Sequence, residues 1–279
     1  MNLNDEERCG FLVKAEMKKV WYIQMSILRE VLAICERHNL RIFADGGTLI
    51  GAIRHKGYIP WDDDIDMGMP REDYDRFCEI APKELPAPYK IYSIMTESHY
   101  EERFIKVVDS STKAIPIGGK KSADDAIGIF VDIFPYDLMP NTPRHVARLV
   151  RKVRRKQTLL KIALRVLNVM PRWLYDRMRV DRKIFKEYEN LIRSFAADSN
   201  RYRTKVALHL REFLYDRRWL ENIKWVDFED IKIPIPEGYD DILTLNYGDY
   251  MTPKQVPSGH AVCRYEIPSD RIPAIDKAE

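Results

Sequence analysis

The chain has 279 residues, of which 45% are hydrophobic and 11% aromatic, and it carries a formal net charge of +3. This composition predicts a globular protein with a substantial core, and no apolar run approaches the ~20 residues that a membrane-spanning helix needs. The cysteines are scattered and the start MNLNDEERCG is polar, so we expect no disulfide framework, no signal peptide and a cytoplasmic location.

The first predicted element is a long helix over residues 6–38. Apolar side chains recur there at steps of three and four, which places them on one helix face toward the core. This stripe consists of Val20, Ile23, Ile27, Val31 and Ile34. We interpret His38, which follows Arg37 and precedes Asn39, as an end group of the helix and not as a catalytic residue.

A glycine pair lies between a short apolar run at residues 41–45 and an apolar helical pattern at residues 48–54. Because glycine adopts backbone angles that side chains forbid, Gly46 and Gly47 predict a sharp turn at the end of a strand. Thr48 is well placed to cap the helix that follows. The unpaired amides and the positive dipole end of such a helix predict a phosphate site.

The stretch WDDDIDMGM at residues 61–69 predicts a strand that is unusually rich in acids. Alternate side chains of a strand share a face, so Asp62, Asp64 and Asp66 would point the same way. Three carboxylates on one face repel one another and require a cation, and their hard oxygen atoms suit Mg²⁺ or Mn²⁺. The alternative is an acidic surface turn, but the position just downstream of a glycine turn favours the metal site.

A helix over residues 71–80 and strands over residues 90–95, 103–109 and 127–134 come next. In the last strand Asp132 interrupts an apolar run, and burying a charge is costly unless it is paired or binds a metal. Asp132 is therefore a candidate to complete the metal site, and Asp109 is the weaker candidate. The alternative is that Asp132 caps a turn into Pro135.

The segment between Leu138 and Tyr175 contains ten Lys or Arg and no Asp or Glu, whereas the rest of the chain is net negative. Within it, residues 143–169 predict an amphipathic helix with one basic face. Such a helix can lie on an anionic membrane surface, where each Lys or Arg contributes about 1 kcal/mol. The more common alternative is a helix packed on its own core with a solvated basic side. We expect no nucleic-acid partner, because no nucleic-acid-binding module is recognisable.

The rest of the chain predicts helices over residues 172–197 and 202–215, a strand over residues 224–233 and a short helix over residues 239–247 that Gly248 ends. Four basic residues are further candidates for contacts with phosphate oxygens. Arg54 and Lys56 follow the glycine helix, and Lys254 and His260 lie in the tail. The alternative for each pair is a solvated position without a role in binding.

Four motifs occur in order along the chain: ADGGTLIGAIRHKGYIPWDDDIDMGMPREDY, FIKVVD, GIFVDIFPYD and LTLNYGDYM. Together they resemble the LicD family of phosphocholine transferases, which is related to the fukutin-type sugar-phosphate transferases. The resemblance is strong over residues 41–76 and 127–137 and weak over residues 140–220. The tail between Tyr247 and His260 matches the closing motif of the family incompletely.

The resemblance implies an α/β (α+β) protein with a nucleotidyltransferase-like mixed sheet, flanked by helices and interrupted by a mainly helical insertion. We expect residues 1–140 to form the catalytic core, residues 141–220 a basic helical segment, and residues 221–279 a C-terminal part that completes the site. These three parts would form one compact unit.

The resemblance also implies roles for the candidate residues. Gly46 and Gly47 would form the phosphate-binding turn, and Asp64 and Asp66 would be paired metal ligands with Asp132 as the third acid. The expected cofactor is Mg²⁺, with Mn²⁺ as the alternative. Either Asp132 or Asp62 would take the proton of the acceptor as general base.

LicD-type enzymes transfer phosphocholine, or a similar phospho-alcohol, from a CDP-activated donor to a hydroxyl of a cell-surface glycan. The resemblance therefore implies CDP-choline or a related CDP-alcohol as donor. The implied acceptor is a glycan such as lipopolysaccharide or teichoic acid, or its lipid-linked precursor, at the inner face of the membrane. Two alternatives remain: a nucleotidyltransferase with a nucleoside triphosphate donor, and a non-catalytic glycan-assembly scaffold, against which the complete set of acids argues.

Overall fold

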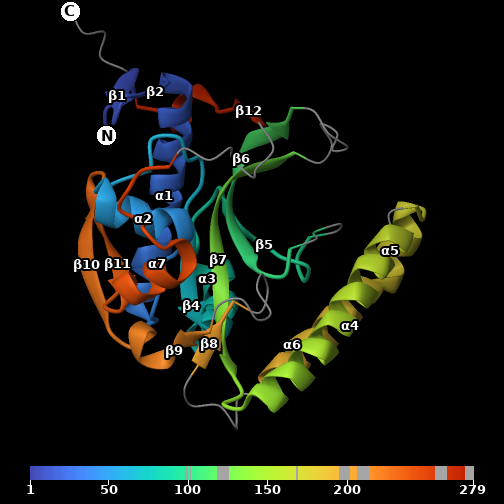
Figure 1. The fold of residues 1–279 in the computed structure, drawn as a ribbon. Helices are drawn as coiled ribbons and strands as arrows, with labels where there is room; N and C mark the ends of the chain where they lie inside the picture. Colours follow the sequence, from blue (N-terminus) through green and yellow to red (C-terminus); the bar gives the residue numbers. More distant parts are fainter. Residues whose placement is uncertain are drawn as a thin grey trace, which may run out of the picture.

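The computed structural model describes residues 1–97, 100, 102–117, 126–167, 169–194, 202–205, 214–254 and 263–273. A mixed sheet crosses the centre of the molecule with the strand order β12-β6-β7-β4-β3 (Figure 1). Its strands are β3 (Phe43–Ala44), β4 (Asp66–Pro70), β5 (Tyr89–Tyr92), β6 (Ile105–Pro116), β7 (Ile127–Met139) and β12 (Cys263–Glu266). β4 and β7 run parallel, while the other neighbours, including β5 beside β6, are antiparallel. The mixed α/β class predicted from the sequence is confirmed.

Helices α1 (Ala15–Arg37) and α3 (Arg71–Glu84) pack on this sheet. The predicted apolar stripe of α1 is confirmed, because all of its side chains are buried in the main core. The helix starts later than predicted, since residues 6–13 form the hairpin β1 (Glu6–Arg8) and β2 (Phe11–Val13). The turn of this hairpin has Cys9 and Gly10 at positive φ, a conformation that a helix excludes.

A second group of elements packs beside β3 and β4: helix α2 (Gly46–Arg54), helix α7 (Tyr239–Tyr247) and the hairpin of β10 (Ile223–Phe228) and β11 (Ile231–Pro236) (Figure 1). The prediction of α7 and its end at Gly248, which has a φ of 66°, is confirmed. The single strand predicted over residues 224–233 is wrong. Glu229 adopts a positive φ there, so the chain reverses and forms two strands.

Alternation along the central strands separates a core face from a polar face. Met67, Val107, Val131 and Ile133 belong to the main core and are fully buried. The side chains between them point to the other face of the sheet, because successive residues of a strand alternate. The sheet therefore presents its polar residues on the face opposite this core.

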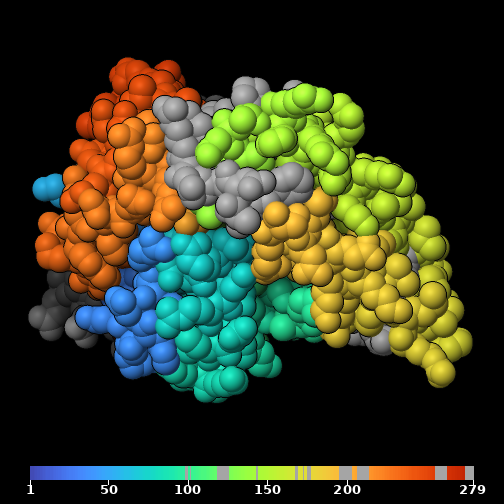
Figure 2. All heavy atoms as spheres, turned by 90° about the horizontal axis from the view of Figure 1, so that it is seen from below, coloured from blue at the N-terminus to red at the C-terminus, as the bar shows by residue number. Residues whose placement is uncertain are grey.

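Helices α4 (Pro143–Leu167), α5 (Arg172–Met178) and α6 (Val180–Arg193) form a helical arm that extends to one side of the sheet (Figures 1 and 2). The predicted basic helix is confirmed as α4. The predicted helix over residues 172–197 is interrupted at Arg179, whose φ is 38°. No helix in the described part of the chain is both long and apolar enough to cross a bilayer.

The helix predicted over residues 202–215 is wrong at both of its described ends. The described residues of this stretch include the short strand β8 (Tyr202–Thr204) and the start of the short strand β9 (Tyr215–Asp216). A 3₁₀ turn at Arg217–Leu220 follows β9. β8 pairs with the end of β7 and with β9. Pairing with the long strand β7, which local sequence patterns do not reveal, overrides the local helical preference.

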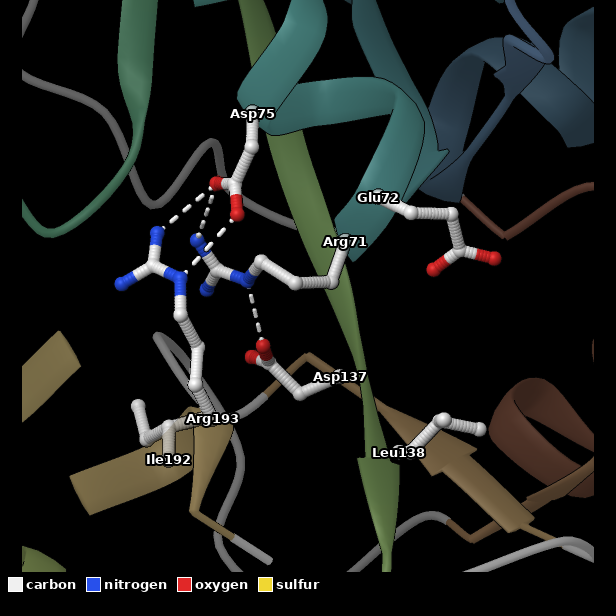
Figure 3. Close-up of a pocket in the computed structure, with 7 residues that line it drawn as sticks. All are labelled: Arg71, Glu72, Asp75, Asp137, Leu138, Ile192 and Arg193. Carbon is white, nitrogen blue, oxygen red and sulfur yellow. Dashed lines mark hydrogen bonds and ion pairs between the residues drawn. The ribbon is translucent and has the colours of Figure 1, made fainter. Parts of the chain in front are cut away.

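A partly buried ionic network fastens the arm to the sheet (Figure 3). Arg71 of α3 donates to Asp137 of β7 at 2.6 Å and to Glu189 of α6 at 2.9 Å, and Arg193 of α6 donates to Asp75 of α3 at 2.8 Å. We call these five residues the Arg71 network. Four of them, Arg71, Asp75, Asp137 and Arg193, line a small cavity of about 190 Å³, and the network holds charges of both signs. The arm is therefore attached at its base by paired charges.

Candidate active site

One row of charged side chains crosses the polar face of the sheet. Asp66 of β4 lies in register with Asp132 of β7, which in turn lies in register with Lys106 of β6. Lys106 donates to both carboxylate oxygens of Asp132, at 2.5 and 2.8 Å, and its ammonium lies 3.6 Å from the ring centre of Phe130. Asp132 is only 7% exposed. Strand pairing thus brings together two acids and one cation that are far apart in the sequence.

The alternative role for Asp132, a cap on a turn into Pro135, is wrong. β7 continues through Pro135 to Met139, so Asp132 lies in the middle of a strand. Asp109, the weaker candidate, is fully buried and pairs with Arg271 at 2.6 Å. Its carboxylate therefore has a structural partner from the C-terminal part of the chain.

Asp62, Asp63 and Asp64 form an acidic loop that precedes β4. The strand predicted over residues 61–69 is thus wrong in its first part, because β4 starts at Asp66. Carboxylate oxygens of the three loop residues lie within 4.8 Å of one another, so Asp63 joins the acids from which a strand would have separated it. Trp21 and Gln24 of α1 donate to the backbone carbonyls of Asp62 and Asp63, which fixes the path of the loop.

The N-terminus of α2 is built differently from the prediction. Asp45 is the N-cap, and its carboxylate accepts from the Gly46 amide at 2.7 Å, so the helix begins two residues before Thr48. Thr48 instead accepts a hydrogen bond from the Asp66 amide at 2.9 Å, and the Asp45 amide donates to the Asp66 carbonyl at 3.0 Å. Thr48 therefore positions Asp66 and does not cap the helix.

The glycine pair allows α2 to approach two carboxylates. A Cβ atom added to Gly46 would lie 3.0 Å from Asp66 Oδ2, and one added to Gly47 would lie 2.4 Å from Asp62 Oδ2. Gly46 also has a φ of +51°, which favours glycine. The positive end of α2 thus faces carboxylates, so a phosphate group at this place would need a cation between them.

The electrostatic balance of these residues is negative. Burial and the neighbouring Asp66 and Asp62 carboxylates raise the pKa of Asp64 well above its usual range. Burial, Asp132 and Asp45 raise the pKa of Asp66 to about 8. We call the whole group the acidic centre: Asp45, Asp62, Asp63, Asp64, Asp66 and Asp132. Neighbouring carboxylates repel one another, and this repulsion raises their pKa values. A bound cation relieves the repulsion.

Two ammonium groups reach the acidic centre among the described ion pairs. Lys106 pairs with Asp132, and Lys205, which follows β8, lies 2.7 Å from Asp45 Oδ2 and is 8% exposed. Two cations leave the six acids net negative. Clustered hard oxygen ligands with uncompensated charge fit a divalent ion such as Mg²⁺ or Mn²⁺, so the donor set agrees with the metal site predicted from the sequence.

Two tyrosines from the last part of the chain lie beside the acidic centre. Burial and the Asp45 and Asp66 carboxylates raise the pKa of Tyr247 in α7. Burial and Asp63 raise the pKa of Tyr265 in β12. Helix α7 and strand β12 therefore each contribute a tyrosine to the surroundings of the acidic centre.

Three of the four basic residues predicted to meet phosphate lie in the described part of the chain. Arg54 donates to the carbonyl of Tyr250 at 2.6 Å, which ties α2 to the segment after α7. Lys56 and Lys254 are exposed, and His260 lies outside the described residues. Contacts of these four residues with phosphate stay a prediction.

The sequence interpretation missed Lys106, Lys205 and Asp45. Lys106 had a detectable signal, because it interrupts the apolar run FIKVV in the same way that Asp132 interrupts its strand. Lys205 had no such signal, since it lies within residues 202–215, which were predicted as a helix. Asp45 was seen only as the end of an apolar run.

The candidate site lies in a region of the chain that matches a known protein family. Residues 39–148 match the family model described as "LicD/FKTN/FKRP, nucleotidyltransferase domain". That range contains all six acids of the acidic centre and Lys106. The chain is 30% identical over 255 residues to the lipopolysaccharide cholinephosphotransferase LicD of Haemophilus influenzae, covering 85% of this chain and 92% of that protein.

Two further relatives match over shorter regions. The human ribitol 5-phosphate transferase FKRP is 29% identical over 89 residues, which is 32% of this chain and 18% of that protein. An uncharacterized protein of Rickettsia prowazekii is 32% identical over 83 residues, which is 30% of each chain. With a relative this similar over nearly its whole length, and with the motif acids gathered at one site, the chain belongs to the LicD family and is a phosphotransferase.

Proposed function

We propose that this protein transfers phosphocholine, or a related phospho-alcohol, from a CDP-activated donor to a hydroxyl of a cell-surface glycan or its lipid-linked precursor in the cytoplasm. The observation that carries the proposal is the acidic centre, a set of acids with uncompensated charge at the N-terminus of α2. The similarity to the lipopolysaccharide cholinephosphotransferase supports phosphocholine and a lipopolysaccharide acceptor. The similarity to the ribitol 5-phosphate transferase FKRP supports ribitol phosphate as the alternative group.

Asp64, Asp66 and Asp132 would hold Mg²⁺ or Mn²⁺. When bound, the ion would neutralise the charge that develops on the transferred phosphoryl group and hold the donor diphosphate in line. The raised pKa values of Asp64 and Asp66 support this role, because both acids need a cation to ionise together at neutral pH.

The protein's own groups would orient the donor around this site. The amides of Gly47 and Thr48 at the start of α2 would face donor phosphate oxygens, since the first amides of a helix lack helical partners. Lys106 and Lys205 would hold the carboxylates of Asp132 and Asp45 through their ion pairs. These two cations would thereby keep the acids in place before the donor arrives.

The general base would be Asp62 or Asp132. Both oxygens of Asp132 accept from Lys106, and a carboxylate held by an ammonium is a weaker base. This ion pair supports a ligand role for Asp132 and favours Asp62, at the edge of the acidic loop, for taking the acceptor proton.

The donor is tested first by thermal shift of the purified protein with Mg²⁺ and CDP-choline, CDP-ribitol, CDP-glycerol, CTP or ATP. A ligand that binds the folded state raises the melting temperature. We expect one CDP-alcohol to raise it only with metal, and we expect Asp64→Asn and Asp66→Asn to abolish this rise. Asp230→Asn, an exposed acid at the turn between β10 and β11, is the matched control and should behave like the unchanged protein.

The outcomes separate the alternatives. A metal-dependent shift with a nucleoside triphosphate alone, with release of pyrophosphate, would replace the proposal by nucleotidyl transfer. No metal-dependent shift with any nucleotide would support a non-catalytic scaffold. Transfer of labelled phosphocholine to purified lipopolysaccharide, lost in Asp66→Asn but not in Asp230→Asn, would establish the full reaction.

A further inference from the structure

Helix α4 uses one side to pack within the arm and against the sheet. Leu149 and Val153 form a core with Tyr188 and Ile192 of α6. Further along, Leu160 and Leu164 pack with Ile94 and Tyr100. The inward stripe that the sequence predicted is therefore satisfied by the chain itself, and the basic side of α4 faces outward.

The outward side carries a second apolar stripe that the core does not need. Leu159, Ile162 and Val166 are 42%, 51% and 54% exposed, and their spacing of three and four places them on one helix face. The stripe continues beyond α4 with Val169 at 84% and Trp173 at 69%. We call these five residues the apolar tip.

Exposed large apolar side chains are concentrated near the apolar tip and are sparse on the rest of the described surface. Six of the twelve large apolar side chains that are exposed in the described residues fall between Leu159 and Met178. A contiguous exposed apolar patch on a soluble fold marks an interaction site. In Figure 1, α5 and the end of α4 lie at the end of the arm that points away from β8 and β9.

The first half of the same outward face is cationic. Arg144, Arg148, Arg151 and Arg155 are exposed at steps of three and four, and α4 contains no Asp or Glu. Three of these arginines, with His145 and Ala147, line a hollow of about 470 Å³. One continuous helix face thus changes from basic to apolar along its length.

This order of chemistry fits a lipid surface. Guanidinium groups bind the phosphates of anionic headgroups, while apolar side chains and Trp enter the boundary between headgroups and acyl chains. A nucleic acid would use the arginines but would gain nothing from the exposed leucine, isoleucine and valine. The charge of the arm opposes the net negative charge of the rest of the chain, so the arm and not the body would face an anionic surface.

We propose that the outer face of α4 and the turn into α5 dock on an anionic membrane surface. Ile162, Val166 and Trp173 enter the headgroup boundary, and Arg144, Arg148 and Arg151 contact lipid phosphates. The paired charges of the Arg71 network hold the arm, so the docked face has a fixed relation to the acidic centre. This inference goes beyond the proposed transfer reaction and does not depend on the identity of the donor.

The test is sedimentation of the full chain with vesicles of phosphatidylcholine alone and of phosphatidylcholine mixed with phosphatidylglycerol. We expect binding to the mixed vesicles that weakens as salt is added, and at least about tenfold weaker binding to neutral vesicles. Quenching by brominated acyl chains should remove the part of the tryptophan emission that Trp173→Phe also removes. Trp225, which is 49% exposed on β10, is the internal control and should not be quenched.

Two variants separate the halves of the face. The double variant Ile162→Ser/Val166→Ser should weaken binding by about tenfold, and Arg148→Gln/Arg151→Gln should weaken it and reduce its salt dependence. Leu12→Ser, an equally exposed apolar residue on β2, is the matched control and should leave binding unchanged. Equal loss in Leu12→Ser would overturn the proposal.

Other results would also overturn it. Equal binding to neutral and anionic vesicles, or unquenched Trp173, would exclude this mode of docking. If sedimentation in solution shows a dimer that Ile162→Ser/Val166→Ser dissociates, then the apolar tip contacts a second copy of the chain. If RNA binds as tightly as anionic vesicles and the apolar variant retains that binding, the arginines serve a nucleic acid.

Discussion

Strand β7 carries two buried carboxylates, Asp132 and Asp137, whose surroundings differ in charge. They lie five residues apart and therefore point to opposite faces of the sheet. Asp137 belongs to the Arg71 network, in which two arginines meet three acids at close distances. Asp132 belongs to the acidic centre, in which Lys106 and Lys205 meet six acids.

The comparison shows how charge balance separates structural from chemical roles. Burial raises the pKa of Asp137, but Arg71 acts in the opposite direction, so the arginines offset most of the negative charge of this network. At Asp66 both burial and the neighbouring acids raise the pKa. Such an uncompensated cluster of acids lowers the stability of the fold, and a bound cation would offset this loss.

The largest expected effect comes from removing one charge of the acidic centre. Asp66→Asn and Asp132→Asn should each lower the transfer rate by about a thousandfold or more, because the centre then loses a metal ligand. The free energy of unfolding without metal should stay constant or rise in Asp66→Asn, since the variant removes repulsion. Steady-state transfer and urea unfolding measure the two quantities. Full activity in either variant would contradict the assignment.

The opposite pattern is expected for the Arg71 network. Arg71→Met leaves the buried Asp137 without the arginine that pairs with it and removes one of the two arginines that pair with Glu189, which should lower the free energy of unfolding by about 3–5 kcal/mol. Urea unfolding gives the value. Arg37→Met removes an arginine from an exposed pair with Glu84 and should cost at most about 1 kcal/mol. Equal losses in the two variants would show that the network does not stabilise the fold.

Gly47→Ala tests the close approach of α2 to the acidic loop. The added methyl group would collide with Asp62 Oδ2, so the carboxylate must move. We expect transfer to fall by about ten- to a hundredfold, because displacing a catalytic group by about 1 Å has effects of this size. Titration with Mn²⁺, followed by thermal shift, should show weaker metal binding. Unchanged transfer would mean that Asp62 has no role in the reaction.

The last expected effect is the pH dependence of stability without metal. The pKa of Asp66 is about 8 in the fold and 3.8 as the ordinary value, so folding favours its protonated form. The contribution of Asp66 to the free energy of unfolding should therefore be fully present below about pH 4 and should be lost as the pH rises to about 8. Melting temperatures of the unchanged protein and of Asp66→Asn, with and without Mg²⁺, measure it. The decline should be weaker in Asp66→Asn and with metal; the same decline in all four samples would assign it to other groups.

The sequence predicted most elements whose pattern is local. The stripe of α1, the basic helix α4 and the end of α7 at Gly248 follow from apolar periodicity and glycine geometry, and the structure confirms them. The hairpins at residues 6–13 and 223–236 were missed because their turns use Cys9 and Glu229 at positive φ, which the sequence signals poorly. The strands β8 and β9 were missed because β8 pairs with the end of β7 and β9 pairs with β8, and local sequence patterns reveal neither pairing.

The sequence by itself determined which residues carry the predicted chemistry. The glycine pair, the run of acids and the isolated Asp132 favour metal and phosphate chemistry, because a charge that interrupts an apolar strand is costly unless it is paired or binds a metal. Only the tertiary structure decided the partners. It placed Lys106 beside Asp132, Lys205 beside Asp45 and Tyr247 beside the acidic loop. The register between strands and the packing of distant segments set these contacts. Both depend on interactions between separate parts of the chain, which no single stretch of sequence reveals.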